Sequence, residues 1–180
     1  MARIDIRLGG SGGQGTITAA AILGYAAVYA GKKAVQTKSY GPEARGGAAR
    51  GEVVISDEDI NYVKVLKSDI LVALTQEACD KFVVDAKEGS IVIVDDFLVK
   101  NKPQGNFKLY SLPIIKTAAE DVGKSMVANI VTLGVVNELA NLIDYEKLEK
   151  GVLSKVPKGT EELNKKALQA GIELARKAKK

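Results

Sequence analysis

The chain contains no histidine and a single cysteine, Cys79, in 180 residues. A cubane iron–sulfur cluster needs four thiolate ligands, so this chain cannot hold one by itself. Without histidine, the chain also lacks the commonest general base and any His–Asp relay. We therefore expect no catalytic residue and no metal site in this chain, which makes a stand-alone redox enzyme the weaker hypothesis.

Several other signals are missing. The sequence contains no G-x-x-x-x-G-K-[ST] loop for nucleotide hydrolysis. It also has no signal-peptide core after Met1 and no apolar run long enough to span a membrane,. A net charge of +4, much of it in the C-terminal lysines, is too small a signal for nucleic-acid binding,. We expect a cytoplasmic protein that binds neither nucleic acid nor membrane.

Strand-like and helix-like patterns alternate along the chain. This alternation predicts a single α/β domain over residues 1–180, a three-layer Rossmann-like fold with a mostly parallel sheet. The expected strands cover residues 4–8, 33–39, 52–56, 70–74, 91–94 and 107–112, with an added hairpin strand at 60–65. The expected helices cover residues 16–30, 76–86, 126–143 and 161–179.

A glycine cluster follows the first expected strand and precedes an alanine-rich helix. Gly10, Gly12 and Gly15 fit G-x-G-x-x-G, in which glycines let the backbone approach a phosphate at a helix N-terminus,. The other interpretation is a tight strand-to-helix turn without a ligand. No acidic residue ends the second expected strand, which makes an ordinary NAD site the weaker hypothesis. The predicted ligand-binding residues are Gly10, Gly12, Gly13, Gln14, Gly15 and Thr16.

The segment 39–51 holds four glycines and a proline, a composition typical of a shaped loop,. Loops that follow strands at the carboxyl edge of a parallel sheet carry ligands in such folds. We therefore expect this loop beside the glycine cluster. The loop carries Glu43, Arg45 and Arg50. A guanidinium of this loop could clamp a carboxylate or a phosphate, or the three charges could pair with one another.

Together these motifs resemble one protein family. Residues 10–15 (Gly-Ser-Gly-Gly-Gln-Gly) and 39–47 (Ser-Tyr-Gly-Pro-Glu-Ala-Arg-Gly-Gly), followed by 129–134 (Asn-Ile-Val-Thr-Leu-Gly), are similar to the gamma subunit of 2-oxoacid:ferredoxin oxidoreductases. The Tyr-Gly-Pro-Glu-Ala-Arg-Gly-Gly form most resembles the 2-oxoglutarate and branched-chain 2-oxoacid enzymes. The likeness spans most of the chain.

The resemblance implies a subunit of an enzyme that oxidatively decarboxylates a 2-oxoacid to an acyl-coenzyme A, with ferredoxin as electron acceptor. It implies that alpha, beta and possibly delta subunits carry thiamine diphosphate, magnesium and the iron–sulfur clusters. Coenzyme A is the ligand expected at the glycine cluster. Tyr40, Glu43, Arg45 and Asn129 are expected at the active-site wall or a subunit interface. The alternative is a non-catalytic Rossmann-like module that binds a nucleotide or phosphate.

Residues 126–143 are apolar nearly all round. Such a helix must be covered on several sides, either at the centre of its own domain or by another chain. On the second interpretation we expect the isolated chain to form a homo-oligomer. The last expected helix, 161–179, has a narrow apolar stripe and covers the edge of the domain.

Four polar or reactive residues receive structural interpretations. Asp95 and Asp96 end a central strand, and because adjacent side chains of a strand point to opposite faces, we expect turn or helix-cap residues rather than a metal site. Thr75 is expected to cap the following helix. Cys79 is expected to pack as a small hydrophobic residue.

Overall fold

The computed structural model describes residues 2–39 and 47–180. The strands are β1 (Ile4–Ser11), β2 (Lys33–Ser39), β3 (Ala48–Ser56), β4 (Ser68–Ala73), β5 (Ala86–Asp95) and β6 (Lys108–Leu112). The α-helices are α1 (Thr16–Tyr29), α2 (Gln76–Phe82), α3 (Ile114–Lys116), α4 (Ala128–Ala140), α5 (Tyr145–Leu153) and α6 (Glu161–Ala178). Short 3₁₀ turns, η2 (Val83–Asp85) and η4 (Ser125–Val127), and a π-helical segment, η3 (Thr117–Val122), complete the described elements.

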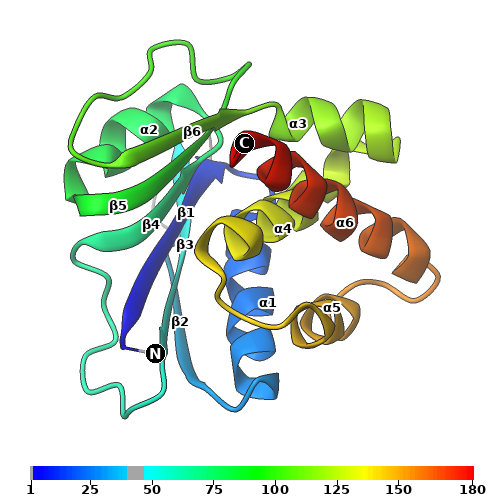
Figure 1. The fold of residues 1–180 in the computed structure, drawn as a ribbon, viewed down its shortest axis with the longest axis horizontal. Coiled ribbons are helices and arrows are strands. Elements are labelled where there is room, and N and C mark those ends of the chain that lie inside the picture. Colours follow the sequence, from blue (N-terminus) through cyan, green and yellow to red (C-terminus); the bar gives the residue numbers. More distant parts are fainter. Residues whose placement is uncertain (1, 40–46) are drawn as a thin grey trace.

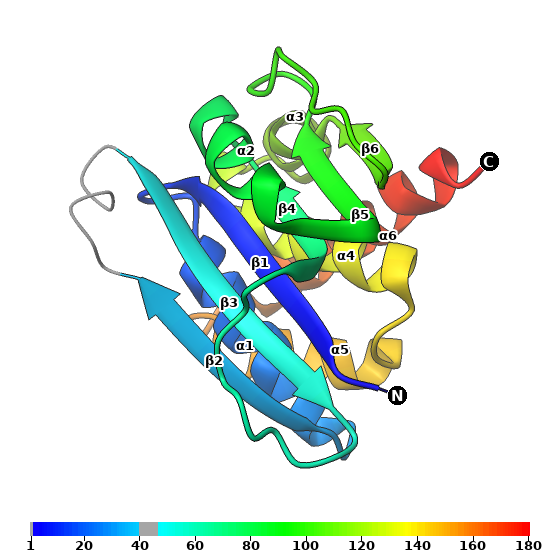
Figure 2. The same ribbon diagram turned by 90° about the vertical axis from the view of Figure 1, so that its left-hand side faces the viewer.

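The strands form one six-stranded sheet in the order β2-β3-β1-β4-β5-β6. β1, β4, β5 and β6 pair in parallel, whereas β3 is antiparallel to both of its neighbours, β1 and β2. β3 is therefore the strand that runs against the other five. The predicted α/β fold with a mostly parallel sheet is confirmed (Figure 2).

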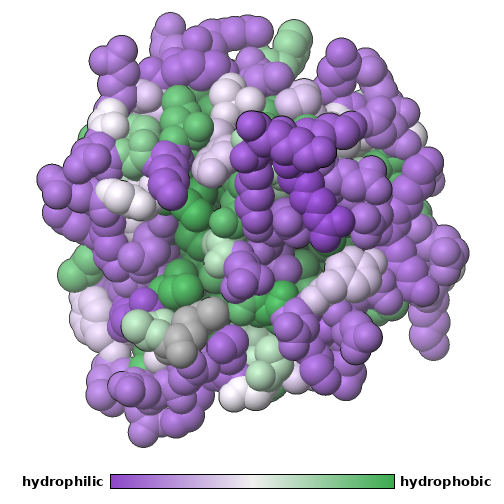
Figure 3. Space-filling view, in the orientation of Figure 1, coloured by the Kyte–Doolittle hydropathy of each residue, from purple (hydrophilic) through white to green (hydrophobic). Residues whose placement is uncertain are grey.

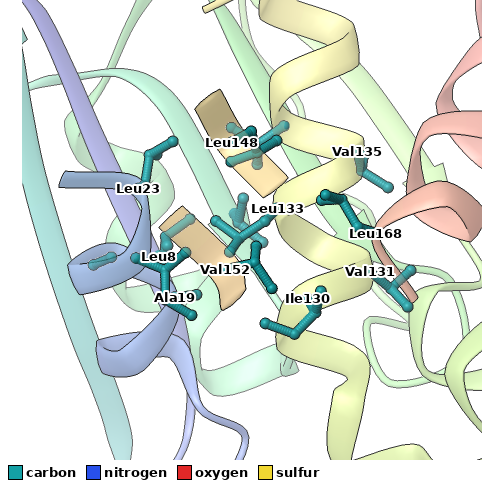
Figure 4. Packing of buried hydrophobic residues seen from close by; sticks show 14 of the residues in the cluster. Leu8, Ala19, Leu23, Ile130, Val131, Leu133, Val135, Leu148, Val152 and Leu168 are labelled. Carbon is teal, nitrogen blue, oxygen red and sulfur yellow. The ribbon is translucent and has the colours of Figure 1, made fainter. Parts of the chain in front are cut away.

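Helices cover both faces of the sheet. α2 lies on one face, and α1, α4, α5 and α6 lie on the other (Figure 1). The larger core fills the space between the sheet and α1, α4, α5 and α6, and Leu8 of β1, Leu23, Leu133 and Leu168 all belong to it (Figure 4). A smaller core under α2 includes Cys79.

Helix α4 occupies the centre of the helical layer. α1, α6 and η3 pack around it, and its side chains from Ile130 to Asn137 are buried in the chain's own core. The all-round apolar character of 126–143 therefore reflects a central position, the first of the two interpretations. The expectation of a homo-oligomer loses its basis, because intramolecular packing already covers α4. The helix also ends earlier than predicted, at Ala140, and is followed by its C-cap residue Asn141, whose φ is +50°.

The third strand begins four residues earlier than predicted. Arg50 and Gly51, assigned above to the loop 39–51, lie inside β3. Pairing on both sides extends the strand, because Ala49 faces Gly10 of β1 and Arg50 faces Ser39 of β2. Glycine suits position 51 because a β-carbon there would lie 2.8 Å from the carbonyl oxygen of Thr16 in α1.

The predicted hairpin strand at 60–65 is wrong, because the segment between β3 and β4 is an irregular loop. Two arginines bind its backbone carbonyls in place of a neighbouring strand. Arg3 donates to the carbonyl oxygens of Tyr62 and Lys64, and Arg7 donates to that of Val65 at 2.7 Å. Figure 2 shows this loop crossing the sheet face on the side away from α1.

The sequence patterns also missed three features. β5 begins at Ala86 rather than at 91, which shortens the preceding helix. The short α3 with its π-helical continuation and the helix α5 were not predicted. The last helix is confirmed as α6, although it packs against α4 along its length rather than covering only an edge.

The structural interpretations of Thr75, of Asp95 with Asp96, and of Cys79 are confirmed, and Asp96 itself lies in the turn after β5. The Thr75 hydroxyl accepts a hydrogen bond from the Ala78 N–H at the start of α2. The Asp95 carboxylate is fully buried and accepts from the N–H groups of Phe97, Leu98 and Ile115, so it fixes the chain after β5. Cys79 is buried in the core under α2.

Candidate functional site

The glycine loop, residues 11–15, joins the carboxyl end of β1 to the first turn of α1. Gly12 and Gly13 are exposed, and Gly13 and Gly15 have φ values of +90° and +73°. Side chains other than glycine rarely adopt that left-handed conformation. The glycines therefore allow the loop to turn sharply and leave its backbone open to solvent.

Gln14 organises the inside of the loop. Its Oε1 accepts a hydrogen bond of 2.7 Å from the Ser11 N–H. The same carboxamide occupies the space that a side chain at position 10 would fill, so Gly10 is buried under Gln14. Thr16 is buried as well. The side chain of Thr16 therefore does not face the outside of the loop, and its contribution to a ligand would come from the backbone.

Among the described residues, no side chain caps the N-terminus of α1. Gly15, its N-cap residue, provides no side chain, and the first turn contains no acidic residue. The N-terminus of α4 has neither a side-chain cap nor an acidic residue in its first turn. Asn129, in the first turn of α4, lies against Gly15 and points its Nδ2 toward the Gly15 carbonyl oxygen at 3.4 Å. The positive end of the α1 dipole thus lies at this loop, an arrangement that favours an anion. α4 contributes the Asn129 side chain, since η4 precedes it directly and the Ser125 carbonyl oxygen accepts from the Ala128 N–H.

A small hollow of about 180 Å³ adjoins this corner. Thr18 of α1, Asn129 of α4 and the exposed Met126 are among its lining residues. The lining is largely apolar, with Lys155 at one side. The site therefore combines backbone donors at the glycine loop with an adjacent apolar surface.

Tyr40, Glu43 and Arg45 lie outside the described residues. The strands that flank them are described, and Ala48 at the start of β3 pairs with Ser11 at the end of β1. Ala48, the first residue of β3, therefore lies directly beside the start of the glycine loop. Arg50 belongs to β3 instead, with its Nε 3.9 Å from Glu52 Oε1.

The sheet order adds a reason against an ordinary dinucleotide site. Such sites use an acidic residue at the end of the strand next to the glycine loop strand. Here β3 separates β2 from β1, so β2 lies about 10 Å from β1 at a strand spacing of about 4.8 Å,. β2 also carries no acidic residue.

Sequence reasoning missed a buried charge network on the opposite sheet face. Arg7 Nε donates to Glu52 Oε1 at 2.7 Å, Arg7 Nη1 donates to Asp85 Oδ2 at 3.0 Å, and Thr37 donates to Glu52 at 3.2 Å. Arg7 and Glu52 are only 2% and 7% exposed. The available signal was that Arg7 and Glu52 are charged residues within otherwise apolar strands. This signal becomes informative only once β1 and β3 are paired, because the pairing sets Arg7 opposite Glu52.

Within residues 2–39 and 47–180, no group of three or more cysteine or acidic side chains is placed to hold a metal ion. None of the helices described there is long and apolar enough to cross a lipid bilayer.

Comparison with known proteins assigns the family. The model of the pyruvate ferredoxin/flavodoxin oxidoreductase family matches residues 5–174. The chain belongs to this family. Among its relatives, subunit KorC of 2-oxoglutarate synthase from Methanocaldococcus jannaschii is 51% identical over 177 residues, which cover 97% of this chain and 95% of the relative. The resemblance to the 2-oxoacid:ferredoxin oxidoreductases that the motifs carried is confirmed.

Solved structures of this oxidoreductase family share the fold. The gamma subunit of a keto/oxoacid ferredoxin oxidoreductase from Geobacter sulfurreducens PCA superimposes with a TM-score of 0.89 at 50% identity, over 97% of this chain and 99% of that subunit. A 2-oxoglutarate:ferredoxin oxidoreductase from Magnetococcus marinus, described with 2-oxoglutarate, coenzyme A and succinyl-CoA bound, gives a TM-score of 0.86 at 24% identity. There, 98% of this chain matches 32% of the larger chain. At that identity the match shows the fold alone.

Proposed function

We propose that the chain is the gamma subunit of a 2-oxoglutarate:ferredoxin oxidoreductase, in which the complete enzyme converts 2-oxoglutarate and coenzyme A to succinyl-CoA and carbon dioxide and reduces ferredoxin. The observation that carries the proposal is the 51% identity to a 2-oxoglutarate synthase subunit over nearly the full length of both chains. We further propose that residues 1–180 form one gamma domain of a cytoplasmic enzyme.

In this proposal, thiamine diphosphate, magnesium and the iron–sulfur clusters belong to the alpha, beta and possibly delta subunits. Two features of this chain support that division. Its one cysteine is buried under α2, and its described residues offer no metal-binding cluster. The subunit therefore supplies binding groups rather than redox groups.

The ligand that we assign to the glycine loop is coenzyme A. The exposed backbone at Gly12 and Gly13, with the first turn of α1, would hold its phosphates. Asn129 would fix the far side of the loop through Gly15. The hollow beside Met126 would take an apolar part of the same ligand. Tyr40, Glu43 and Arg45 would form the wall toward the subunits that carry thiamine diphosphate.

Reconstitution tests the function. We expect the purified chain to be colourless and inactive alone, and to restore ferredoxin reduction when combined with its partner subunits. The specificity constant kcat/KM should be highest for 2-oxoglutarate, ahead of 3-methyl-2-oxobutanoate and pyruvate. Reduction of ferredoxin by the isolated chain would refute the proposal. A preference for a different 2-oxoacid would refute the assigned substrate.

Arg45 tests the proposed wall. In the assembled enzyme, Arg45→Ala should lower kcat/KM ten- to hundredfold, because a charged hydrogen bond contributes roughly 1.5–3 kcal/mol. Arg45→Lys should restore little, since lysine lacks the planar fork of a guanidinium. Wild-type kinetics of Arg45→Ala would show that Arg45 only secures its own loop.

A further inference from the structure

Exposed apolar side chains gather at the loop between β3 and β4. Nine large hydrophobic side chains are exposed among the described residues, and four of them lie on this loop or beside it. We call these four the β3–β4 patch: Tyr62, Val63, Leu66 and Val84. Leu66 is 65% exposed and Val84 75%. Such clustering marks an interaction site more often than single exposed hydrophobic residues do.

The buried Arg7 joins the two parts of the patch, the β3–β4 loop and the η2 turn that carries Val84. Arg7 donates to the Val65 carbonyl oxygen in the loop and to the Asp85 carboxylate beside Val84. Val63, Leu66 and Asp85 also line the same hollow over the sheet. Loop and η2 therefore form one continuous surface.

The backbone of the patch is fixed before any partner arrives. Arg3 and Arg7 together bind three carbonyl oxygens in four consecutive residues, those of Tyr62, Lys64 and Val65. Because Arg7 is almost fully buried, its position cannot change without breaking its ion pairs. A surface that is already ordered loses less conformational entropy on binding.

The shape suits a folded partner. Residues 62–67 form a ridge between two hollows, one of about 530 Å³ over β1, β2 and β3 and one of about 410 Å³ at the start of β1. The side chains of Lys64 and Leu66 line both hollows. A ridge with a hollow on each side offers interlocking contacts to a complementary protein surface.

The charge around the ridge decides which partner fits. Arg3 and Lys87 are already paired with Asp5 and Asp69. Lys64 and Lys67 stand on the ridge, and the structure shows no ion pair for either of them with a described residue. Two-fold self-association would place these lysines near their own copies, which is unfavourable. The surface therefore favours an acidic partner over a second copy of this chain.

We propose that the β3–β4 patch is the docking surface for another subunit of the same oxidoreductase, one that presents apolar side chains ringed by carboxylates. This inference rests on the proposed function, in which the chain works within a multisubunit enzyme. Arg7, which binds both the β3–β4 loop and Asp85, lies four residues before Ser11 on β1, about 13 Å from the start of the glycine loop at about 3.3 Å per residue,. The patch lies on the sheet face away from α1, whereas the glycine loop leads into α1 (Figure 2).

The decisive experiment measures subunit assembly with a double variant, Leu66→Glu and Val84→Glu. The chain is titrated into the partner subunits, and binding is followed by sedimentation velocity. We expect at least tenfold weaker association and an unchanged melting temperature of the free chain, since both side chains are exposed. Phe97→Glu is the matched control, because Phe97 is 66% exposed but lies after β5. It should assemble like the wild type.

A second variant tests the charge. Lys64→Glu with Lys67→Glu should slow association and reduce its sensitivity to salt. The proposal would be overturned if the Leu66→Glu and Val84→Glu variant bound the partner subunits as tightly as the wild-type chain does. It would also be overturned if Phe97→Glu weakened this binding equally. If the free wild-type chain forms a dimer and the Leu66→Glu and Val84→Glu variant does not, a second copy of this chain occupies the patch, and the proposal is overturned. The proposed function fails separately, if the wild-type chain neither assembles with the partner subunits nor supports oxidation of 2-oxoglutarate.

Discussion

Gly134 of α4 and Gly171 of α6 lie directly against each other where the two helices meet. A β-carbon at Gly134 would overlap the carbonyl oxygen of Leu168, and one at Gly171 would overlap that of Val131. The backbones of α4 and α6 are therefore in contact, and this close approach lets α6 cover the apolar surface of α4. Figure 3 shows apolar side chains along the seam between the sheet and the helical layer, within a largely hydrophilic surface.

Gly134→Ala should therefore destabilise the fold by about 2–3 kcal/mol, in the range found for overpacked cores. The clash is with backbone atoms, which cannot rotate away. Gly24→Ala in α1 is the control, because its new β-carbon would meet only Val53 Cγ2 at an ordinary 3.7 Å. That change should be neutral or stabilise by up to about 1 kcal/mol through helix propensity. Urea unfolding measures both, and equal stabilities would contradict the helix contact.

The buried ion pair of Arg7 and Glu52 should contribute strongly when only one partner is removed. Glu52→Ala leaves the buried guanidinium of Arg7 with only one carboxylate partner, the more exposed Asp85, and we expect a loss of about 3–5 kcal/mol,. Replacing both residues, Arg7→Met with Glu52→Leu, should recover much of that loss. The control, Lys165→Ala, removes an exposed pair with Glu162 and should cost no more than about 0.5 kcal/mol,. A small effect of Glu52→Ala would show that water reaches the pair.

Gly15→Ala should impair coenzyme A more than 2-oxoglutarate. Its β-carbon would lie 2.7 Å from Asn129 Nδ2 and would force an alanine to φ +73° at the start of α1. In the assembled enzyme, we expect the KM for coenzyme A to rise at least about tenfold, or roughly 1.4 kcal/mol, and the KM for the 2-oxoacid to stay within about twofold.

Gly31→Ala is the matched control for that experiment. Gly31 also has a positive φ, +79°, but it follows the opposite end of α1. A β-carbon added at Gly31 would have no neighbouring atom within 4 Å. It should cost stability without changing either KM. Equal losses for both substrates in folded, assembled Gly15→Ala enzyme would indicate that the glycine serves only the turn.

Cys79 should be unreactive in the folded chain. Burial, and to a lesser extent the negative charge of Asp80, raises the pKa of the thiol, so the reactive thiolate is scarce at neutral pH,. As the chain's one thiol, it allows a direct assay with a disulfide reagent at pH 8. We expect labelling at least about 100-fold slower than in urea-unfolded chain, because reagent access requires local opening. Rapid labelling of the folded chain would contradict the core position under α2.

Local sequence determined the parts of this protein that depend on neighbouring residues. Alternating apolar residues before Gly9 and an alanine-rich run after Gly15 specify the strand, turn and helix of the candidate site. Thr75 and Asp95 were interpretable because caps and turns bind N–H groups within a few residues. The motifs at 10–15 and 39–47 also identified the family, since they combine uncommon residues in a fixed order.

Tertiary structure decided the features that depend on distant residues. Only strand pairing places β3 between β1 and β2, brings Ala48 beside Ser11 and sets Arg7 against Glu52. Only helix packing shows that α4 is buried by its own chain through Gly134 and Gly171. The arginines of β1 hold residues 62–65 as a loop where the sequence alone predicted a strand. These contacts join residues 37 to 61 positions apart, so their energies cannot be recognised in a local pattern.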